Sequence, residues 1–169
     1  MAARFALVAV LAAVFAAPAG AATGGYPAAY APCRWNGAVY GPCTDFAWGY
    51  RAHDGSWSLI SKRGFDYRNC TDYVAWKLKL TWGDFHFSGR GDASLWRAHA
   101  ARIGRIATQT PHLGDIAWWP ASSSEPEGHV GIVVALGPAG TARVAEYNYD
   151  GYGRYDVRTT YAPAYLHHP

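Results

Sequence analysis

The chain has 169 residues, with fifteen Lys and Arg against twelve Asp and Glu, a formal charge of +3. So weak and scattered a positive charge excludes nucleic acid as the partner. The length allows a single domain with a core of its own. Eight tryptophans and twelve tyrosines are many for this length. Because these side chains combine an apolar face with a polar edge, they suit partly wet pockets that hold sugars or peptides.

The first 22 residues resemble an export signal. Arg4 precedes an apolar run at 5–15, and small residues fill 17–22. The run is too short to span a membrane and is typical of a secretory signal peptide. We therefore expect residues 1–22 to be removed, leaving a secreted, monomeric chain with a formal charge near +2 and no membrane span.

Residues 23–50 have no hydrophobic period and are rich in Gly, Pro, Ala and Tyr, which predicts an extended N-terminal arm. Cys33 and Cys43 flank a short loop of turn residues in this arm. In an exported chain they are the simplest pair to form a disulfide, worth about 3 kcal/mol in the chain-entropy model. Since the chain has three cysteines, Cys70 would stay unpaired. The domain proper is expected at 51–169.

The turn signals of 51–65 predict a loop that leads into a helix beginning at Cys70. Semi-apolar residues recur after it at Tyr73, Val74 and Leu78, which is a helical spacing. A cysteine in the first turn of a helix meets the positive end of the dipole, which favours the nucleophilic thiolate. The alternative is a small buried apolar residue or half of a disulfide.

A second helix is predicted from Asp92 or Ser94 to about Ile106, and the hydrophobic period then changes to that of strands. The apolar stripe of this helix consists of Leu95, Trp96, Ala100 and Ile103. Strands are predicted at 116–119, 130–136, 143–149 and 155–160. Helices followed by strands predict an α+β fold with an antiparallel sheet.

The sequence 137–140, Gly-Pro-Ala-Gly, predicts a hairpin turn that sets Leu136 opposite Thr141. In that register His129 faces Asn148 directly, and Gly131 faces Glu146. All four then share one face of the sheet, with the Glu146 carboxylate diagonal to the imidazole. Gly131 would let a neighbouring element approach closely.

A histidine with polar partners at the end of an apolar strand face is where a general base and its orienting group are expected. The alternative is an exposed strand end with ordinary polar residues. The other histidines lack such a partner set; they are His53, His86, His99, His112, His167 and His168, of which the last two stand at an end expected to fray. A zinc site is not predicted, because no cysteine pair or histidine spacing fits one.

Five blocks in this order resemble the CHAP domain family, cysteine-dependent amidohydrolases and peptidases of the NlpC/P60-like, papain-related superfamily. The blocks are 69–76, 96–104, 111–118, 128–133 and 144–148. The resemblance implies a papain-like α+β fold in which N-terminal helices pack on an antiparallel sheet. It also implies a hydrolase of peptidoglycan, either an N-acetylmuramoyl-L-alanine amidase or a cross-link endopeptidase, secreted or associated with the cell wall.

Carried over by position, the resemblance implies Cys70 as nucleophile, His129 as general base and Glu146 as the third polar residue, with Asn148 as its companion. Glu146 or Asn148 would hold the second imidazole nitrogen, and we favour Glu146. The family often has glycine two residues before the cysteine, where this chain has Arg68.

The Cys70 N–H is the expected oxyanion donor. Four further residues are expected to contact substrate: Asp72, Tyr73, Trp118 and Trp119. No metal or cofactor is expected. The competing hypothesis is a non-catalytic secreted module of the same fold that binds cell-wall glycan through its tryptophans and tyrosines.

Overall fold

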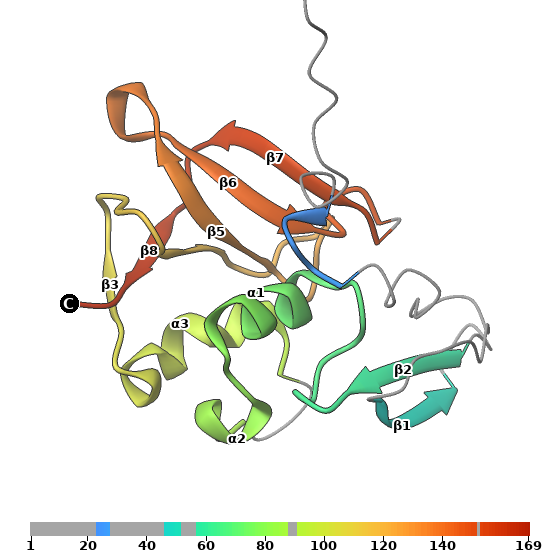
Figure 1. Ribbon diagram of the computed structural model, residues 1–169. Helices are drawn as coiled ribbons and strands as arrows, with labels where there is room; N and C mark the ends of the chain where they lie inside the picture. Colours follow the sequence, from blue (N-terminus) through green and yellow to red (C-terminus); the bar gives the residue numbers. More distant parts are fainter. Residues whose placement is uncertain (1–22, 28–45, 52–56, 88–90, 152) are drawn as a thin grey trace, which may run out of the picture.

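The computed structural model describes residues 23–27, 46–51, 57–87, 91–151 and 153–169, with the backbone alone at 46–51 and 57–58 (Figure 1). No helix among these residues is long and apolar enough to cross a membrane. The predicted signal peptide and the predicted Cys33–Cys43 disulfide lie outside the described residues and stay predictions.

The fold is α+β, as predicted, and its centre is a six-stranded antiparallel sheet (Figure 1). The spatial order is β3-β8-β4-β5-β6-β7. The strands are β3 (Ile106–Thr108), β4 (Ile116–Trp119), β5 (His129–Leu136), β6 (Ala142–Tyr147), β7 (Tyr155–Thr160) and β8 (Ala164–His167). The strands predicted from their alternation became β4, β5, β6 and β7.

Helix α1 (Cys70–Leu78) packs against β5 and β6 and begins at the predicted cysteine. Asn69 is its N-cap, and the chain leaves it at Lys79 in the left-handed conformation. Tyr73 and Val74 are buried in the main core, as their spacing predicted. In Figure 1 the helix lies along one face of the sheet, so its first turn can reach the end of β5.

The predicted second helix is broken into three short turns, η3 (Ala93–Leu95), α3 (Trp96–His99) and η4 (Ala100–Ile103). Gly104, at φ 68°, ends this run in the left-handed conformation, so the helix stops before the predicted Ile106. Trp96 is fully buried, in agreement with its place on the apolar stripe. A single-turn helix, α2 (Trp82–Phe85), lies between α1 and this run.

A separate hairpin of β1 (Phe46–Arg51) and β2 (Trp57–Ser61) precedes α1 (Figure 1). The prediction of a loop over 51–65 is therefore wrong at β2, and β1 crosses the predicted border at residue 50. Strands β3 and β8 were also missed. β8 lies inside the sheet with Ala164, Tyr165 and Leu166 all buried, so it shows no alternation of polar and apolar residues.

Apolar side chains cover both faces of the sheet. The main cluster lies between the helices and the sheet and includes Val130 and Ile132, whereas Val133, Val144 and Tyr165 belong to a second cluster. Segment 23–27 docks on the first cluster through Tyr26, whose ring lies 5.0 Å from that of Tyr147. The fold thus holds α1 firmly against the β5–β6 hairpin.

The β5–β6 hairpin keeps the predicted register only beyond a bulge. Leu136 pairs with Ala142, one residue away from the predicted Thr141. A shift between Val133 and Ala135 then restores the predicted register, since Ile132 pairs with Ala145. The bulge absorbs the extra residue near the turn. His129 and Glu146 therefore end up on the predicted diagonal.

Candidate active site

His129 and Glu146 are joined at the end of the β5–β6 hairpin. The His129 Nε2 and Glu146 Oε2 atoms are 2.8 Å apart, and both side chains are buried. Gly131 makes this approach possible, because a Cβ at that position would lie 2.4 Å from Val144 Cγ1 and 3.2 Å from Glu146 Cβ. The hydrogen bond assigns Nε2 to the carboxylate and leaves Nδ1 for another partner.

Arg158, which the sequence reading did not single out, neutralises the Glu146 carboxylate. It projects from β7, and its Nε donates to Glu146 Oε1 while its Nη2 lies 3.4 Å from Oε2. Its guanidinium also lies over the ring of Tyr149, 3.8 Å from the centroid. A carboxylate buried without a cation would be costly, and the Arg158 guanidinium offsets this cost beside the imidazole.

Cys70, in the first turn of α1, changes the pKa of the His129 imidazole. Burial alone would lower the pKa of His129, but the Cys70 side chain, through charge and hydrogen bonding, and the Glu146 carboxylate together raise that pKa to about 10. Nδ1 makes no well-aligned hydrogen bond within the described part of the chain. With its pKa raised to about 10, the imidazole beside the Cys70 side chain is suited to hold a proton at neutral pH and to deliver it during a reaction.

Cys70 is a free thiol and 5% exposed. Its N–H donates to the side-chain oxygen of Asn69 over 2.8 Å, so the expected oxyanion donor is occupied by the helix cap.

Arg68, at the position where the family often has glycine, has φ 59°. Arginine therefore adopts the left-handed conformation that glycine favours, and the backbone shape before the cysteine is kept at the cost of strain.

Asn148 lies beside the loop that precedes α1. Its side-chain oxygen accepts from Gly153 N–H over 2.7 Å, and its Nδ2 lies 3.4 Å from Asn69 Oδ1. Asn148 has φ 62° and leads the chain out of β6. The contact to the imidazole thus comes from Glu146, and Asn148 contacts Asn69, the residue that caps the helix beginning at Cys70.

Asp72 and Tyr73, expected to contact substrate, are both buried. The Asp72 carboxylate accepts hydrogen bonds from Tyr26, from Ser61 Oγ over 2.6 Å and from Arg63 Nε and Nη2 over 2.8 Å each. These contacts join segment 23–27, β2 and α1. Asp72 therefore holds the elements that surround Cys70.

The two expected tryptophans differ in position. Trp118 is 7% exposed, and its Nε1 donates to Ala93 O over 2.9 Å. Trp119 is partly exposed and pairs across the sheet with His129, with ring centroids 5.7 Å apart. Tyr149 lies at the same distance on the imidazole and is 47% exposed. Trp119 and Tyr149 are thus the aromatic groups beside the site that solvent reaches.

One exposed carboxylate also borders the imidazole. Glu125 Oε1 lies 3.7 Å from His129 Nδ1, and its side chain is 38% exposed. It belongs to the turn between β4 and β5, where Glu125 N–H donates to Ser122 O and Ser122 Oγ. The nitrogen that faces the thiol is therefore also open to a solvent-side carboxylate.

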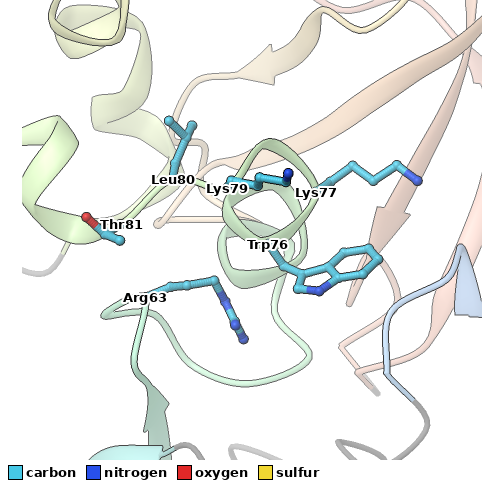
Figure 2. A pocket seen from close by; sticks show the side chains of 6 residues that line it. All are labelled: Arg63, Trp76, Lys77, Lys79, Leu80 and Thr81. Carbon is cyan, nitrogen blue, oxygen red and sulfur yellow. The ribbon is translucent and has the colours of Figure 1, made fainter.

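A cavity of about 440 Å³ lies at the other end of α1, lined by the residues that Figure 2 labels: Arg63, Trp76, Lys77, Lys79, Leu80 and Thr81. Lys77 Nζ lies 5.7 Å from the Trp76 ring, and Arg63 is paired with Asp72. Cys70, His129 and Glu146 do not line this cavity. Because it gathers cations at a helix C-terminus, where they are favourable, the arrangement is explained by the helix dipole.

The CHAP domain family model matches residues 60–148, which is more than half of the chain. The chain belongs to the CHAP domain family. The matched range begins at β2 and ends just past β6, so it includes α1 and the hairpin that carries His129 and Glu146. The family suggested by the blocks around Cys70 and His129 is thereby confirmed.

The probable autolysin LDP of Staphylococcus aureus (strain NCTC 8325 / PS 47) is 34% identical over 113 residues, which cover 64% of this chain and 39% of that protein. This chain thus spans about two fifths of that relative's length. A solved N-acetylmuramoyl-L-alanine amidase from Staphylococcus aureus matches with a TM-score of 0.50 and 24% identity, over 63% of this chain and 32% of the other. This second likeness concerns the fold alone.

Proposed function

We propose that this chain is a secreted, cysteine-dependent hydrolase that cleaves an amide bond of peptidoglycan. The observation that carries the proposal is the joining of three buried groups from distant parts of the chain. The Cys70 thiol acts on the imidazole of His129, whose other nitrogen is held by Glu146 over 2.8 Å. A nucleophile, a base and an orienting carboxylate in this order are the requirements of acyl transfer through a thioester.

In the proposed reaction the proton of Cys70 rests on His129 Nδ1 before the substrate binds, since the pKa of this imidazole is raised to about 10, and the sulfur then attacks the carbonyl carbon of the amide. The imidazolium then returns the proton to the leaving nitrogen as the carbon–nitrogen bond breaks. A thioester remains, and water adds to it with His129 again as base, which releases the acid and restores the thiol. Glu146 fixes the tautomer and stabilises the imidazolium, and Arg158 holds Glu146.

The oxyanion of the tetrahedral intermediate requires a donor close to the sulfur. The Cys70 N–H is suitable in position, and it is bonded to Asn69 Oδ1. In the proposed mechanism the Cys70 N–H gives up its hydrogen bond to Asn69 Oδ1 and donates to the substrate oxygen instead. Asn148, 3.4 Å from the same Oδ1, is placed to hold Asn69 in either position.

The exposed aromatic groups beside the imidazole favour a substrate that combines apolar faces with hydrogen-bonding groups. Trp119 and Tyr149 provide such surfaces. Glycan and stem peptide of the cell wall both have this character, and the relative with 34% identity is a probable autolysin. An amidase that cuts between sugar and peptide and an endopeptidase that cuts cross-links both fit these contacts.

The test is mass analysis of the muropeptides that purified wall material releases with the wild type and with Cys70→Ala. We expect release by the wild type and a loss of at least about 10³-fold in the variant. The masses distinguish the amidase from the endopeptidase. Equal release by both proteins would remove Cys70 from the mechanism.

Thiol labelling of the native protein separates the enzyme from a wall-binding module of the same fold. The enzyme is expected to have one fast-reacting thiol at Cys70, which slows in His129→Gln. A slow thiol in the wild type, together with retained binding to wall material and no release, would establish the binding module instead.

A further inference from the structure

The far end of β4 holds a second cluster of histidine and carboxylate. His112 Nδ1 lies 3.3 Å from Asp115 Oδ2, and His167 Nδ1 lies 2.8 Å from Asp115 Oδ1. One ligand atom from each of the three residues lies within 4.8 Å of the others. From the sequence we expected no partner set for His112 and a frayed end at His167, and both expectations are wrong.

Strand register builds this cluster. Ile116 of β4 pairs with Leu166 of β8, so the preceding Asp115 and the following His167 come to face each other. The tight turn before β4 supplies His112, whose N–H donates to Asp115 Oδ2 over 2.8 Å. The imidazole rings of His112 and His167 are 4.1 Å apart at their centroids. Two separate segments of the chain therefore meet at one carboxylate.

We propose that His112, Asp115 and His167 bind a divalent cation of the zinc type and thereby tie the turn before β4 to the end of β8. Zinc bonds to imidazole nitrogen and carboxylate oxygen at about 2.0–2.2 Å, which places tetrahedral donors about 3.3 Å from one another. The contact of His112 with Asp115 Oδ2, at 3.3 Å, has that spacing, whereas the contact of His167 with Asp115 Oδ1, at 2.8 Å, is shorter, so the His167 ring must move apart slightly when the ion binds. Water would complete the coordination.

The surroundings of Asp115 select the kind of ion. Its carboxylate is 2% exposed, and the guanidinium of the buried Arg105 acts on it electrostatically while the Arg105 Nη1 donates to Leu166 O over 2.9 Å. Because Arg105 offsets the single negative charge, attraction to a hard cation such as Mg²⁺ or Ca²⁺ is weak. The two imidazoles instead favour zinc, nickel or copper.

An ion can reach the cluster, because the side chains of His112 and His167 are 48% and 27% exposed. Binding moves each Nδ1 proton to Nε2 or to solvent and replaces the bonds to Asp115 by bonds to the metal. The cluster lies at the opposite end of β4 from Trp119, which pairs with His129. The metal would therefore act on stability and take no part in the hydrolysis proposed above.

The test is zinc titration calorimetry on the full chain carrying Cys70→Ala, which removes the thiolate as a competing ligand. We expect His112→Gln and His167→Gln each to weaken zinc binding at least about tenfold. Glutamine keeps a hydrogen bond to Asp115 but is a poor zinc ligand, so the fold is retained. His168→Gln, one residue away, is the matched control and should bind as the parent does. Equal affinity in all four proteins would overturn the proposal.

Two further measurements keep the test decisive if a variant folds poorly. Zinc, but not magnesium, should raise the melting temperature of the parent and of His168→Gln, since an ion that binds the native state stabilises it. In the parent, one equivalent of zinc should shift the imidazole proton resonances of His112 and His167. Unshifted resonances of these two residues at saturation would contradict the proposed ligands.

Discussion

The sheet carries a histidine–carboxylate cluster at each end of β4, and the two differ in what surrounds the carboxylate. Both carboxylates are buried and each has an arginine nearby, Arg158 for Glu146 and Arg105 for Asp115. At Glu146 a single imidazole is bonded and is itself only 3% exposed. At Asp115 two imidazoles share the carboxylate, and both reach solvent.

The difference shows how similar residues are directed to different chemistry. His129 is buried, and its Nε2 is held by Glu146 alone, which suits the proposed base. At Asp115 two partly exposed imidazoles and one carboxylate place a ligand atom each within 4.8 Å of the others, which suits the proposed metal ion. If both proposals hold, burial and the number of imidazoles separate proton transfer from ion binding, with the same side-chain types.

The largest expected effect is on kcat, and it distinguishes the two carboxylates when each is replaced by an amide, first Glu146 and then Asp115. Glu146→Gln keeps the side-chain shape but removes the charge that orients and stabilises the imidazolium, so we expect a loss of about 10²- to 10⁴-fold in kcat on wall material. Asp115→Asn should leave kcat within about threefold and weaken zinc binding.

Glu146→Gln also leaves Arg158 without its carboxylate, so the protein should lose a few kcal/mol of stability. Activity is therefore measured at a low temperature at which circular dichroism shows both variants to be folded. If both substitutions reduced kcat equally, the division of labour between the two clusters would be refuted.

A second effect concerns the dependence of stability on pH. The pKa of His129 is raised from 6.5 to about 10, against the effect of burial, by Cys70 and Glu146. The folded state therefore holds this proton more tightly than the unfolded chain does. Its stabilising contribution is complete below pH 6.5 and is lost as the pH rises toward 10.

Urea unfolding from pH 6 to 10 measures this contribution. The free energy of unfolding of the wild type should fall with pH more steeply than that of His129→Gln, by a few kcal/mol over the range. His167→Gln, from the exposed cluster, is the control and should follow the wild type. Parallel curves for the wild type and His129→Gln would show that the imidazolium gains nothing from folding.

The smallest effect is expected from Glu125, the exposed carboxylate beside the imidazole of His129. Glu125→Gln removes a charge 3.7 Å from His129 Nδ1 that is 38% exposed. Because exposed ion pairs contribute at most about 1 kcal/mol, kcat/KM should change by less than about fivefold. A loss as large as that of Glu146→Gln would make Glu125 the orienting group and reverse the assignment.

Local pattern was sufficient for the elements next to the candidate nucleophile and base. The spacing of Cys70, Tyr73 and Val74 predicted α1 and its first residue, and the turn at 137–140 predicted the β5–β6 hairpin. The diagonal of His129 and Glu146 followed from alternation along two strands. The roles of these residues in catalysis remain predictions that the proposed variants test.

Other features depended on contacts that local pattern does not encode. β8 is buried on both faces between β3 and β4, and a strand in that position has no alternation to read. The β1–β2 hairpin likewise has no clear period in the sequence. Arg158 was missed because its link to Glu146 joins β7 to β6, and only the register of that pair brings the two side chains together.

The sequence by itself determined the family, the α+β class and the cysteine at the beginning of its helix, because these depend on spacing within short segments. The tertiary structure decided which groups meet. It gave the second imidazole nitrogen to Glu146, gave Asn148 to the helix cap, and brought His167 to His112 and Asp115 across strands far apart in the chain. Contacts of this kind depend on the order of the strands in the sheet and on a one-residue bulge. Neither feature can be recognised from a short segment of the sequence.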